Sequence, residues 1–345
     1  MRPRWAATAL AALATFASAG LERAARAAQD AFLARAEVIE WMETYRLRPQ
    51  PERLPMAIKA LSRFGALREP ENAGFPTGFV AGVLGSNRAR AEALVARMLP
   101  LPAADQWIVV RGIAYSGLPS WQSLLARIAP QLSARRAMID EYLVGRLPVL
   151  QAIERDADPT FLETLRMQLA SQPKSPRVSF SSNPELIDTL WGAYFATGSY
   201  WPIWRLMTLL PWSKERDSLA RLSAGSAAKV TLANNAARYP DLLALIREMA
   251  PYQDEEVRPI LAEVIHAAET AQAAQLRKTQ LALIEELKSK GPGYRRDMKL
   301  WGHVGQGAIA LGCIAAASVS LTALGLPCVI GGALSSAAIN YMASQ

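Results

Sequence analysis

The sequence predicts an all-α protein, in which a solenoid-like array of helical hairpins is followed by an apolar helical hairpin at the C-terminus. Helix-forming residues recur across residues 28–287, interrupted by Gly, Pro and short polar segments that end helices. Two segments of this body share a pattern typical of a helical hairpin. The last stretch, residues 304–345, contains no Asp, Glu, Lys, Arg or His.

The first half of the body, residues 28–173, begins its helices at residues that favour helix N-termini. Pro51 with Glu52 fits a first turn, and Asp105 and Ser120 are candidate N-caps. The apolar pattern predicts helices over residues 30–46, 51–64, 89–98, 106–116, 121–128, 133–143, 148–155 and 160–171. Residues 75–84 are apolar and rich in Gly, which fits a close-packed helix or a loop.

The second half, residues 183–287, follows the least helical part of the body. Residues 174–182 contain an alternating pattern typical of an extended linker. Asn183 as N-cap and Pro184 at the first helical position predict the start of a new helix. Helices are predicted over residues 184–197, 201–210, 217–237, 241–250 and 254–288.

Two similar segments indicate helical hairpins. Residues 113–117 and 194–198 each end an apolar helix with a hydroxyl residue and a Gly, and Gly can take the left-handed conformation that closes a helix. A helix carrying Trp121 or Trp201 then returns. Gly117 and Gly198 are 81 residues apart, which fits two units of about 40 residues, the HEAT-like period.

The body resembles HEAT and tetratricopeptide solenoids in this pattern. With its LWGAYFATG stretch at residues 190–198 and its LANNA stretch at residues 232–236, it is also similar to uncharacterised exported bacterial helical proteins. The resemblance covers the body only and implies no activity.

The uncharged C-terminal stretch is typical of membrane contact. Residues 304–324 would span about 31 Å as a helix, close to the thickness of a bilayer core. Gly325 and Pro327 break it, and residues 328–342 suit a re-entrant or interfacial helix or the second arm of a hairpin. The alternative is a buried hairpin in a soluble core. The residues expected to contact lipid are Ile309, Leu311, Ile314, Val319, Leu321 and Leu324.

A basic linker, residues 288–303, precedes this stretch. Such a cluster beside an apolar helix attracts anionic lipid headgroups, although the Gly- and Pro-containing segment also reads as a solvated hinge. The residues expected to contact headgroups are Lys288, Lys290, Arg295, Arg296 and Lys299.

The N-terminus, residues 1–19, has the pattern of an export signal. Arg2 and Arg4 precede an apolar run, and Ala17 and Ala19 form a cleavage pattern. We therefore expect an exported protein on the periplasmic face of a membrane. Lys and Arg beside membrane helices usually stay in the cytoplasm, however, so an inner-membrane protein with a cytoplasmic body is the alternative.

The sequence contains no recognisable catalytic set, metal motif, cofactor motif or nucleic-acid motif. The leading hypothesis is a non-enzymatic, membrane-attached scaffold that binds lipid and a protein or peptide partner. The alternative is a pore-forming-like protein whose C-terminal hairpin enters lipid on a trigger. Trp201 and Trp204, with Arg205 at the edge, form a candidate partner groove, whereas a hairpin core is the plainer interpretation of these aromatic residues.

Overall fold

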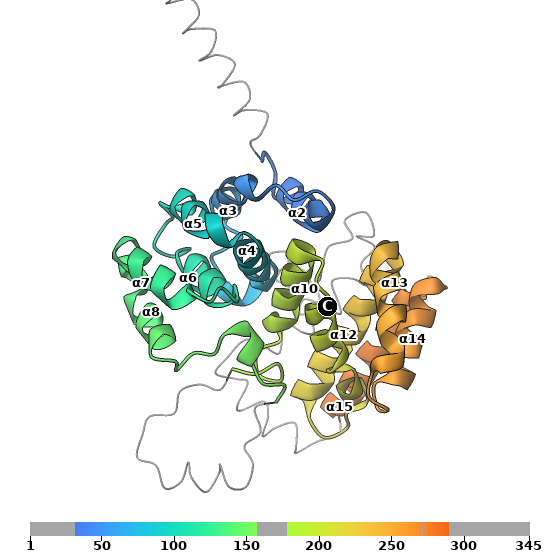
Figure 1. Ribbon diagram of the computed structural model, residues 1–345. Helices are drawn as coiled ribbons and strands as arrows, with labels where there is room; N and C mark the ends of the chain where they lie inside the picture. Colours follow the sequence, from blue (N-terminus) through green and yellow to red (C-terminus); the bar gives the residue numbers. More distant parts are fainter. Residues whose placement is uncertain (1–31, 157–177, 271, 290–345) are drawn as a thin grey trace, which may run out of the picture.

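The computed structural model describes residues 32–156, 178–270 and 272–289, and over these ranges the chain is helical without a β-strand, so the all-α prediction is confirmed (Figure 1). The α-helices are α2 (Arg35–Thr44), α3 (Leu54–Arg63), α4 (Gly74–Ser86), α5 (Ala91–Met98), α6 (Trp107–Ala114), α7 (Trp121–Ile128), α8 (Arg136–Leu143), α10 (Glu185–Thr197), α11 (Tyr200–Met207), α12 (Leu219–Arg238), α13 (Pro240–Met249), α14 (Arg258–Glu269) and α15 (Ala273–Ser289).

Two predicted helices differ from the structure. Residues 148–155 form only the short 3-10 helix η6 (Leu150–Ala152), because the next carbonyls bond elsewhere: Ile153 O accepts from Arg205, and Glu154 O accepts from the backbone N–H of Phe180. The helix predicted over residues 254–288 is divided into α14 and α15, with the backbone N–H of Gln272 closing the end of α14. The helix predicted over residues 160–171 lies outside the described residues.

The predicted side-chain N-caps are also absent. Helix α6 begins without a side-chain cap, and Asp105 instead accepts a hydrogen bond from Ser62 Oγ at 2.5 Å. Ser120 makes no capping hydrogen bond to α7. Asn183 Oδ1 accepts from Ser182 Oγ at 3.0 Å rather than from an α10 backbone N–H, and the Asn183 amide donates to Glu185 Oε1 at 3.1 Å. These helices therefore depend on packing more than on local capping.

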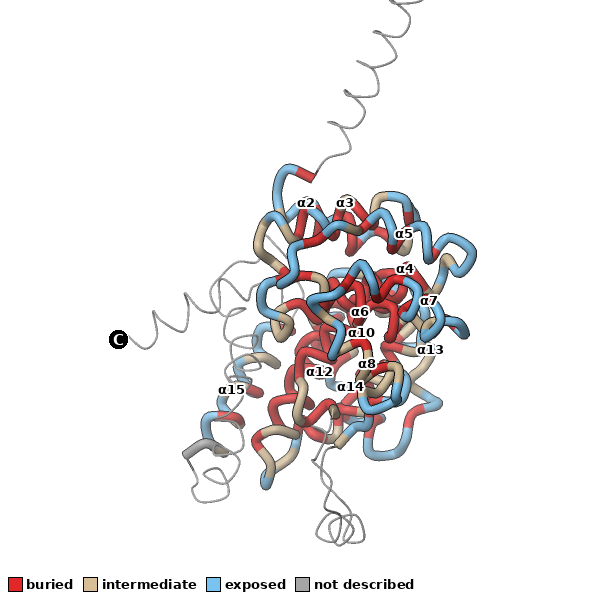
Figure 2. The backbone as a smooth tube through the Cα atoms, turned by 90° about the vertical axis from the view of Figure 1, so that its left-hand side faces the viewer, coloured by how far each residue is buried: buried red, intermediate tan, exposed pale blue. Residues whose placement is uncertain are grey.

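Helix α4 forms the centre of the body and packs between α6 and α10 (Figure 1). From Gly74 to Leu84 every residue of α4 is buried, and Figure 2 shows this buried centre in red. The Gly-rich stretch is therefore a helix rather than a loop. Its lack of a polar face is explained by neighbours on several sides.

The three central helices run parallel to one another. Gly74 lies against Glu185 and Gly78 lies against Thr189, so α4 and α10 advance together. Gly112 of α6 lies against Val80, and Ser116 lies against Gly85 one turn further on, so α6 has the same direction. The C-terminal ends of α4, α6 and α10 consequently lie at the same end of the layer.

Glycine makes the α4–α10 approach possible. A Cβ atom on Gly78 would lie 1.8 Å from Thr189 O, and a Cβ on Gly192 would lie 2.0 Å from Phe75 O. Both neighbours are backbone atoms, which cannot move aside as a flexible side chain can. Each helix thus has a glycine pressed against the backbone of the other.

A buried arginine joins the start of the body to its second half. Arg46 pairs with Asp241 at 2.8 Å, and its side chain is only 4% exposed. Its guanidinium also lies 4.9–5.3 Å from the ring centroids of Tyr194, Phe195 and Tyr239. In a solenoid, each repeat contacts only its neighbours in the sequence, so this long-range contact is not one that the repeat pattern provides. The solenoid-like arrangement stays a prediction.

Within the described residues, no helix combines the length and apolar character needed to cross a bilayer. The predicted export signal, the apolar stretch and its expected lipid-contacting residues lie outside the described residues. The linker was predicted to start at residue 288, but α15 continues to Ser289.

Two acids are buried at the N-terminal end of the central layer. Glu185 and Asp188 occupy the first turn of α10, and Asp188 Oδ1 has no hydrogen-bond partner among the described residues. Burial, and next the charge of Glu185, raises the pKa of Asp188 well above its ordinary value. The N-terminal ends of α4 and α10 lie side by side here, and their dipoles favour negative charge.

This burial predicts a pH-dependent free energy of unfolding. The pKa of Asp188 is raised in the folded state. Its contribution to the free energy of unfolding is therefore fully present below the pKa of the unfolded chain, near pH 4, and is lost as pH rises through the folded pKa. Asp188→Asn should flatten the fall in unfolding free energy above pH 4, measured by urea unfolding across pH 4–8. The exposed Asp140→Asn serves as control and should keep the wild-type slope. An Asp188→Asn slope equal to that of the wild type would contradict this account.

Candidate functional site

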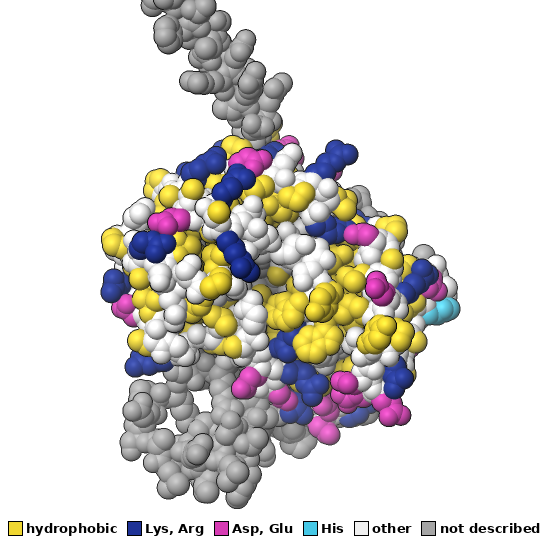
Figure 3. All heavy atoms as spheres, viewed as in Figure 1, with side chains coloured by type: hydrophobic (Ala, Val, Ile, Leu, Met, Phe, Trp, Pro, Cys, Tyr) yellow, Lys and Arg dark blue, Asp and Glu magenta, His cyan; other side chains and the backbone are white. Residues whose placement is uncertain are grey.

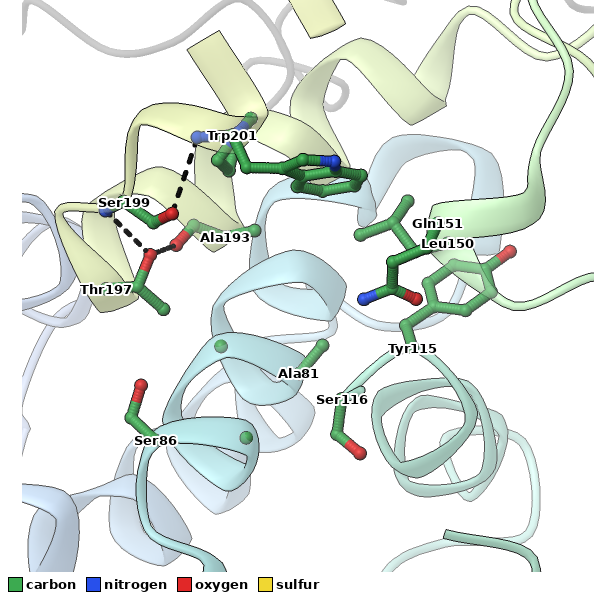
Figure 4. Close-up of a pocket in the computed structure, with 13 residues that line it drawn as sticks. Ala81, Ser86, Tyr115, Ser116, Leu150, Gln151, Ala193, Thr197, Ser199 and Trp201 are labelled. Atoms are coloured by element: carbon green, nitrogen blue, oxygen red, sulfur yellow. Dashed lines mark hydrogen bonds between the residues drawn. The ribbon is translucent and has the colours of Figure 1, made fainter. Parts of the chain in front are cut away.

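A cavity of about 290 Å³ lies where the C-terminal ends of α4, α6 and α10 meet (Figure 4). Its size is near the lower limit for small-ligand pockets. The lining residues include Gly85 and Ser86 of α4, Tyr115 and Ser116 after α6, Leu150 and Gln151 of η6, Ala193 and Thr197 of α10, and Ser199, Trp201 and Pro202 at the start of α11.

Two left-handed glycines shape the walls of this cavity. Gly117 and Gly198 have φ angles of 67° and 65°, as the sequence predicts for residues that end helices. The backbone N–H of Gly198 bonds to Tyr194 O, which ends α10 and leads the chain directly into α11. The two similar segments of the sequence therefore meet at one site, one on each side of the end of α4.

The hydroxyl groups before these glycines present acceptors to the cavity. Thr197 Oγ1 donates to Ala193 O at 2.7 Å and accepts from Ser199 N at 3.1 Å, as Figure 4 shows. Ser116 Oγ donates in the same way to Ile113 O at 2.6 Å. A hydroxyl has one hydrogen to donate and two lone pairs. With both hydrogens used within the helices, these groups can offer a ligand only lone pairs.

Of the three predicted groove residues, Trp201 alone lines the cavity. Its indole is half-buried and faces η6 in Figure 4, whereas Trp204, one turn along α11, is 41% exposed. Arg205 turns to a different contact: it donates to Ile153 O at 2.5 Å and lies over the Phe180 ring. Burial, and next the neighbouring Arg155, lowers the pKa of Arg205. Arg205 therefore fixes the segment after η6.

The other tryptophans of the aromatic cluster belong to the core. Trp191 is fully buried, and its Nε1 donates to Thr231 Oγ1 at 3.0 Å. Trp212 is also buried. The hairpin-core interpretation thus applies to these two residues, and the groove interpretation can apply only to Trp201 and Trp204. In Figure 3, hydrophobic side chains gather over the part of this face where Figure 1 labels α10 and α12.

The sequence interpretation did not single out Gln151 or Tyr115. Gln151 is exposed, its amide points toward the space between Trp201 and Ser116, and it hydrogen-bonds to none of the described residues (Figure 4). Tyr115 is buried, with its ring edge-on to Tyr142 at 6.3 Å between centroids. Burial, and next the Tyr142 hydroxyl, raises the Tyr115 pKa well above its ordinary value.

Among the described residues that line the cavity there is no Asp, Glu, Lys, Arg, His or Cys. Across the described residues, no group of His, Cys, Asp and Glu side chains is arranged to hold a metal ion. The arrangement suits recognition, since it offers an aromatic face, hydroxyl lone pairs and an amide. It does not supply a general acid or base poised near neutral pH.

Of the predicted headgroup contacts, Lys288 lies in the last turn of α15, and Lys290, Arg295, Arg296 and Lys299 lie outside the described residues.

No family model, curated protein or solved structure matches this chain.

The buried position of Trp191 and the half-buried position of Trp201 predict different effects of substitution on stability. Trp191→Ala should lower the free energy of unfolding by about 3–5 kcal/mol, because it leaves a cavity and removes the hydrogen bond from the indole to Thr231 Oγ1. Trp201→Ala should cost about 1 kcal/mol, because the indole is half-exposed and already borders open space. Urea unfolding monitored by circular dichroism measures both. Equal losses for the two variants would place Trp201 in the core and remove it as a binding residue.

Proposed function

We propose that this chain is a non-enzymatic, membrane-attached interaction protein that acts outside the cytoplasm. Its solenoid-like helical body binds a protein or peptide partner at the cavity, and its C-terminal segment binds membrane lipid. The observation that carries the binding role is the half-buried Trp201, which lines an open cavity one helical turn from the exposed Trp204.

The surroundings of Trp201 support binding rather than catalysis. Tryptophans beside pockets are typical anchors of protein–protein interfaces, where they bury a large area at little cost in rotamer freedom. Among the described lining residues, Tyr115 has the one phenol, and its raised pKa keeps that phenol protonated near neutral pH. Packing holds the cavity walls in place, because α6 and α10 both pack against α4.

The membrane role is supported by the sequence. The uncharged residues 304–345 follow a basic linker and a helix, α15, that ends at Ser289. This order places a positively charged segment between the folded body and the apolar stretch, where anionic headgroups would bind it. The export pattern at residues 1–19 supports a position on the periplasmic face.

Membrane attachment through the C-terminal segment has a direct test. Full-length protein should remain with the membranes after washing at alkaline pH, whereas a variant ending at residue 303 should be released. Both proteins should retain the same cooperative unfolding of the helical body. If both wash off together, the attachment is lost as an explanation. Release of dye from anionic liposomes by the purified full-length protein would instead favour the membrane-inserting alternative.

A further inference from the structure

We propose that the cavity binds an alkylammonium group, carried by a lysine side chain of the partner or by a free organic amine. This choice of ligand rests on the binding role proposed above for the cavity. It goes further by assigning the charge and shape of the group that enters. Four features of the site lead to it.

The first feature is the electrostatic character of the cavity end of the layer. Helices α4, α6 and α10 run parallel and end at the cavity, with Ser86, Ser116 and Thr197 in its lining. The C-terminal end of a helix carries a partial negative charge, because its last carbonyls point outward along the axis. The last turns of three such helices line one space, and their partial negative charge favours a cation there over a carboxylate or phosphate.

The second feature is that the opposing helix end is already capped. Helix α11 begins at the same cavity, and an uncapped N-terminus would attract anions. However, Ser199 Oγ accepts the hydrogen bond of the Trp201 N–H, and Pro202 has no N–H to offer. The positive character of α11 at the cavity is therefore reduced, as the local hydrogen bonds to Ile113 O, Ala193 O and Tyr194 O reduce the negative character of α6 and α10.

The third feature is the set of hydrogen-bonding groups. Thr197 and Ser116 have used their hydrogens on helix carbonyls, and each accepts one backbone N–H, from Ser199 and Leu118 respectively. One lone pair on each hydroxyl remains for a donor. The Gln151 amide, which no described residue hydrogen-bonds, adds donors and an acceptor to this lining. An ammonium group carries three N–H donors and no acceptor, which complements these groups.

The fourth feature is the fit of the remaining surface. The Trp201 indole offers a face for a cation or its alkyl chain, and Ala81, Ala193 and Leu150 are apolar. A cavity of about 290 Å³ accepts a chain of about four carbons with its ammonium group. The described lining contains no acidic side chain, so the proposed recognition uses neutral dipoles and an aromatic ring rather than an ion pair.

The test uses the full-length protein with n-butylammonium as the probe, followed by NMR of the tryptophan indole N–H signals. The signal assigned by its loss in Trp201→Phe should shift and saturate with n-butylammonium. The uncharged 1-pentanol and the anionic pentanoate should shift it far less. A lysine-containing peptide that binds more tightly than n-butylammonium would identify a protein source, and equal affinity would identify a free amine; both results support the proposal.

Variants of matched chemistry locate the effect. Thr197→Val keeps the shape of the side chain but removes a hydrogen-bond acceptor. It should weaken n-butylammonium binding three- to tenfold, measured by intrinsic fluorescence. Thr270→Val is the control, because Thr270 also donates to the carbonyl four residues earlier, but at the C-terminal end of α14. Trp201→Ala should abolish binding and Trp201→Phe should retain most of it.

Two results would overturn the ammonium assignment. One is that pentanoate or pentanol binds as well as n-butylammonium. The other is that no saturable shift occurs while urea unfolding shows the chain to be folded. The broader binding role is tested separately: a partner that needs Trp201 but no positive charge would support the role while removing the ammonium assignment.

Discussion

The close contact between α4 and α10 is the constraint on which the rest of this structure depends. Gly78 and Gly192 each press against a backbone atom of the opposite helix, so the two helices can approach only without side chains at these positions. Gly112 provides a similar contact to α4 from the side of α6. The resulting layer has three parallel helices whose ends coincide, and the cavity is a consequence of that coincidence.

Parallel packing gives the two ends of the layer opposite electrostatic characters. The N-terminal end of α10 contains the buried acids Glu185 and Asp188, whose negative charge the helix ends favour. The C-terminal end contains a cavity whose described lining has hydroxyl groups and no charged side chain. The Arg46 contact with Tyr194 and Asp241 holds α2 against this layer and so joins distant parts of the chain. The proposed cationic ligand would complement the partial negative charge at the cavity end, as the two acids complement the partial positive charge at the N-terminal end.

Local signals predicted much of the secondary structure and little of the site. Gly117 and Gly198 end helices because only glycine readily takes a positive φ, and this requirement is visible in the sequence. The spacing of Gly74, Gly78 and Gly82 indicates close packing, but the partner helix lies more than 100 residues away and no local pattern identifies it. The same limit applies to the helix wrongly predicted over residues 148–155, where the carbonyls bond to Arg205 and Phe180 instead.

The cavity shows this limit most clearly. Trp201 could be named from its aromatic neighbours, whereas Arg205 has the right charge for an edge position yet holds the segment after η6. Gln151 has no local signal, since it reaches the cavity only because η6 packs beside α6. The hydroxyls of Ser116 and Thr197 were visible as helix-ending residues, but their convergence requires knowledge of the parallel layer.

The most direct measurement on this layer is the free energy of unfolding of Gly78→Ala. Alanine is intrinsically the better helix former by about 1 kcal/mol, so without the backbone contact the variant would gain stability. The contact with Thr189 O predicts instead a loss of about 3 kcal/mol, measured from the urea midpoint at constant m-value. Gly145→Ala, at a positive φ in open space, should lose only about 1 kcal/mol. An unchanged or increased stability of Gly78→Ala would contradict the close-packed parallel layer.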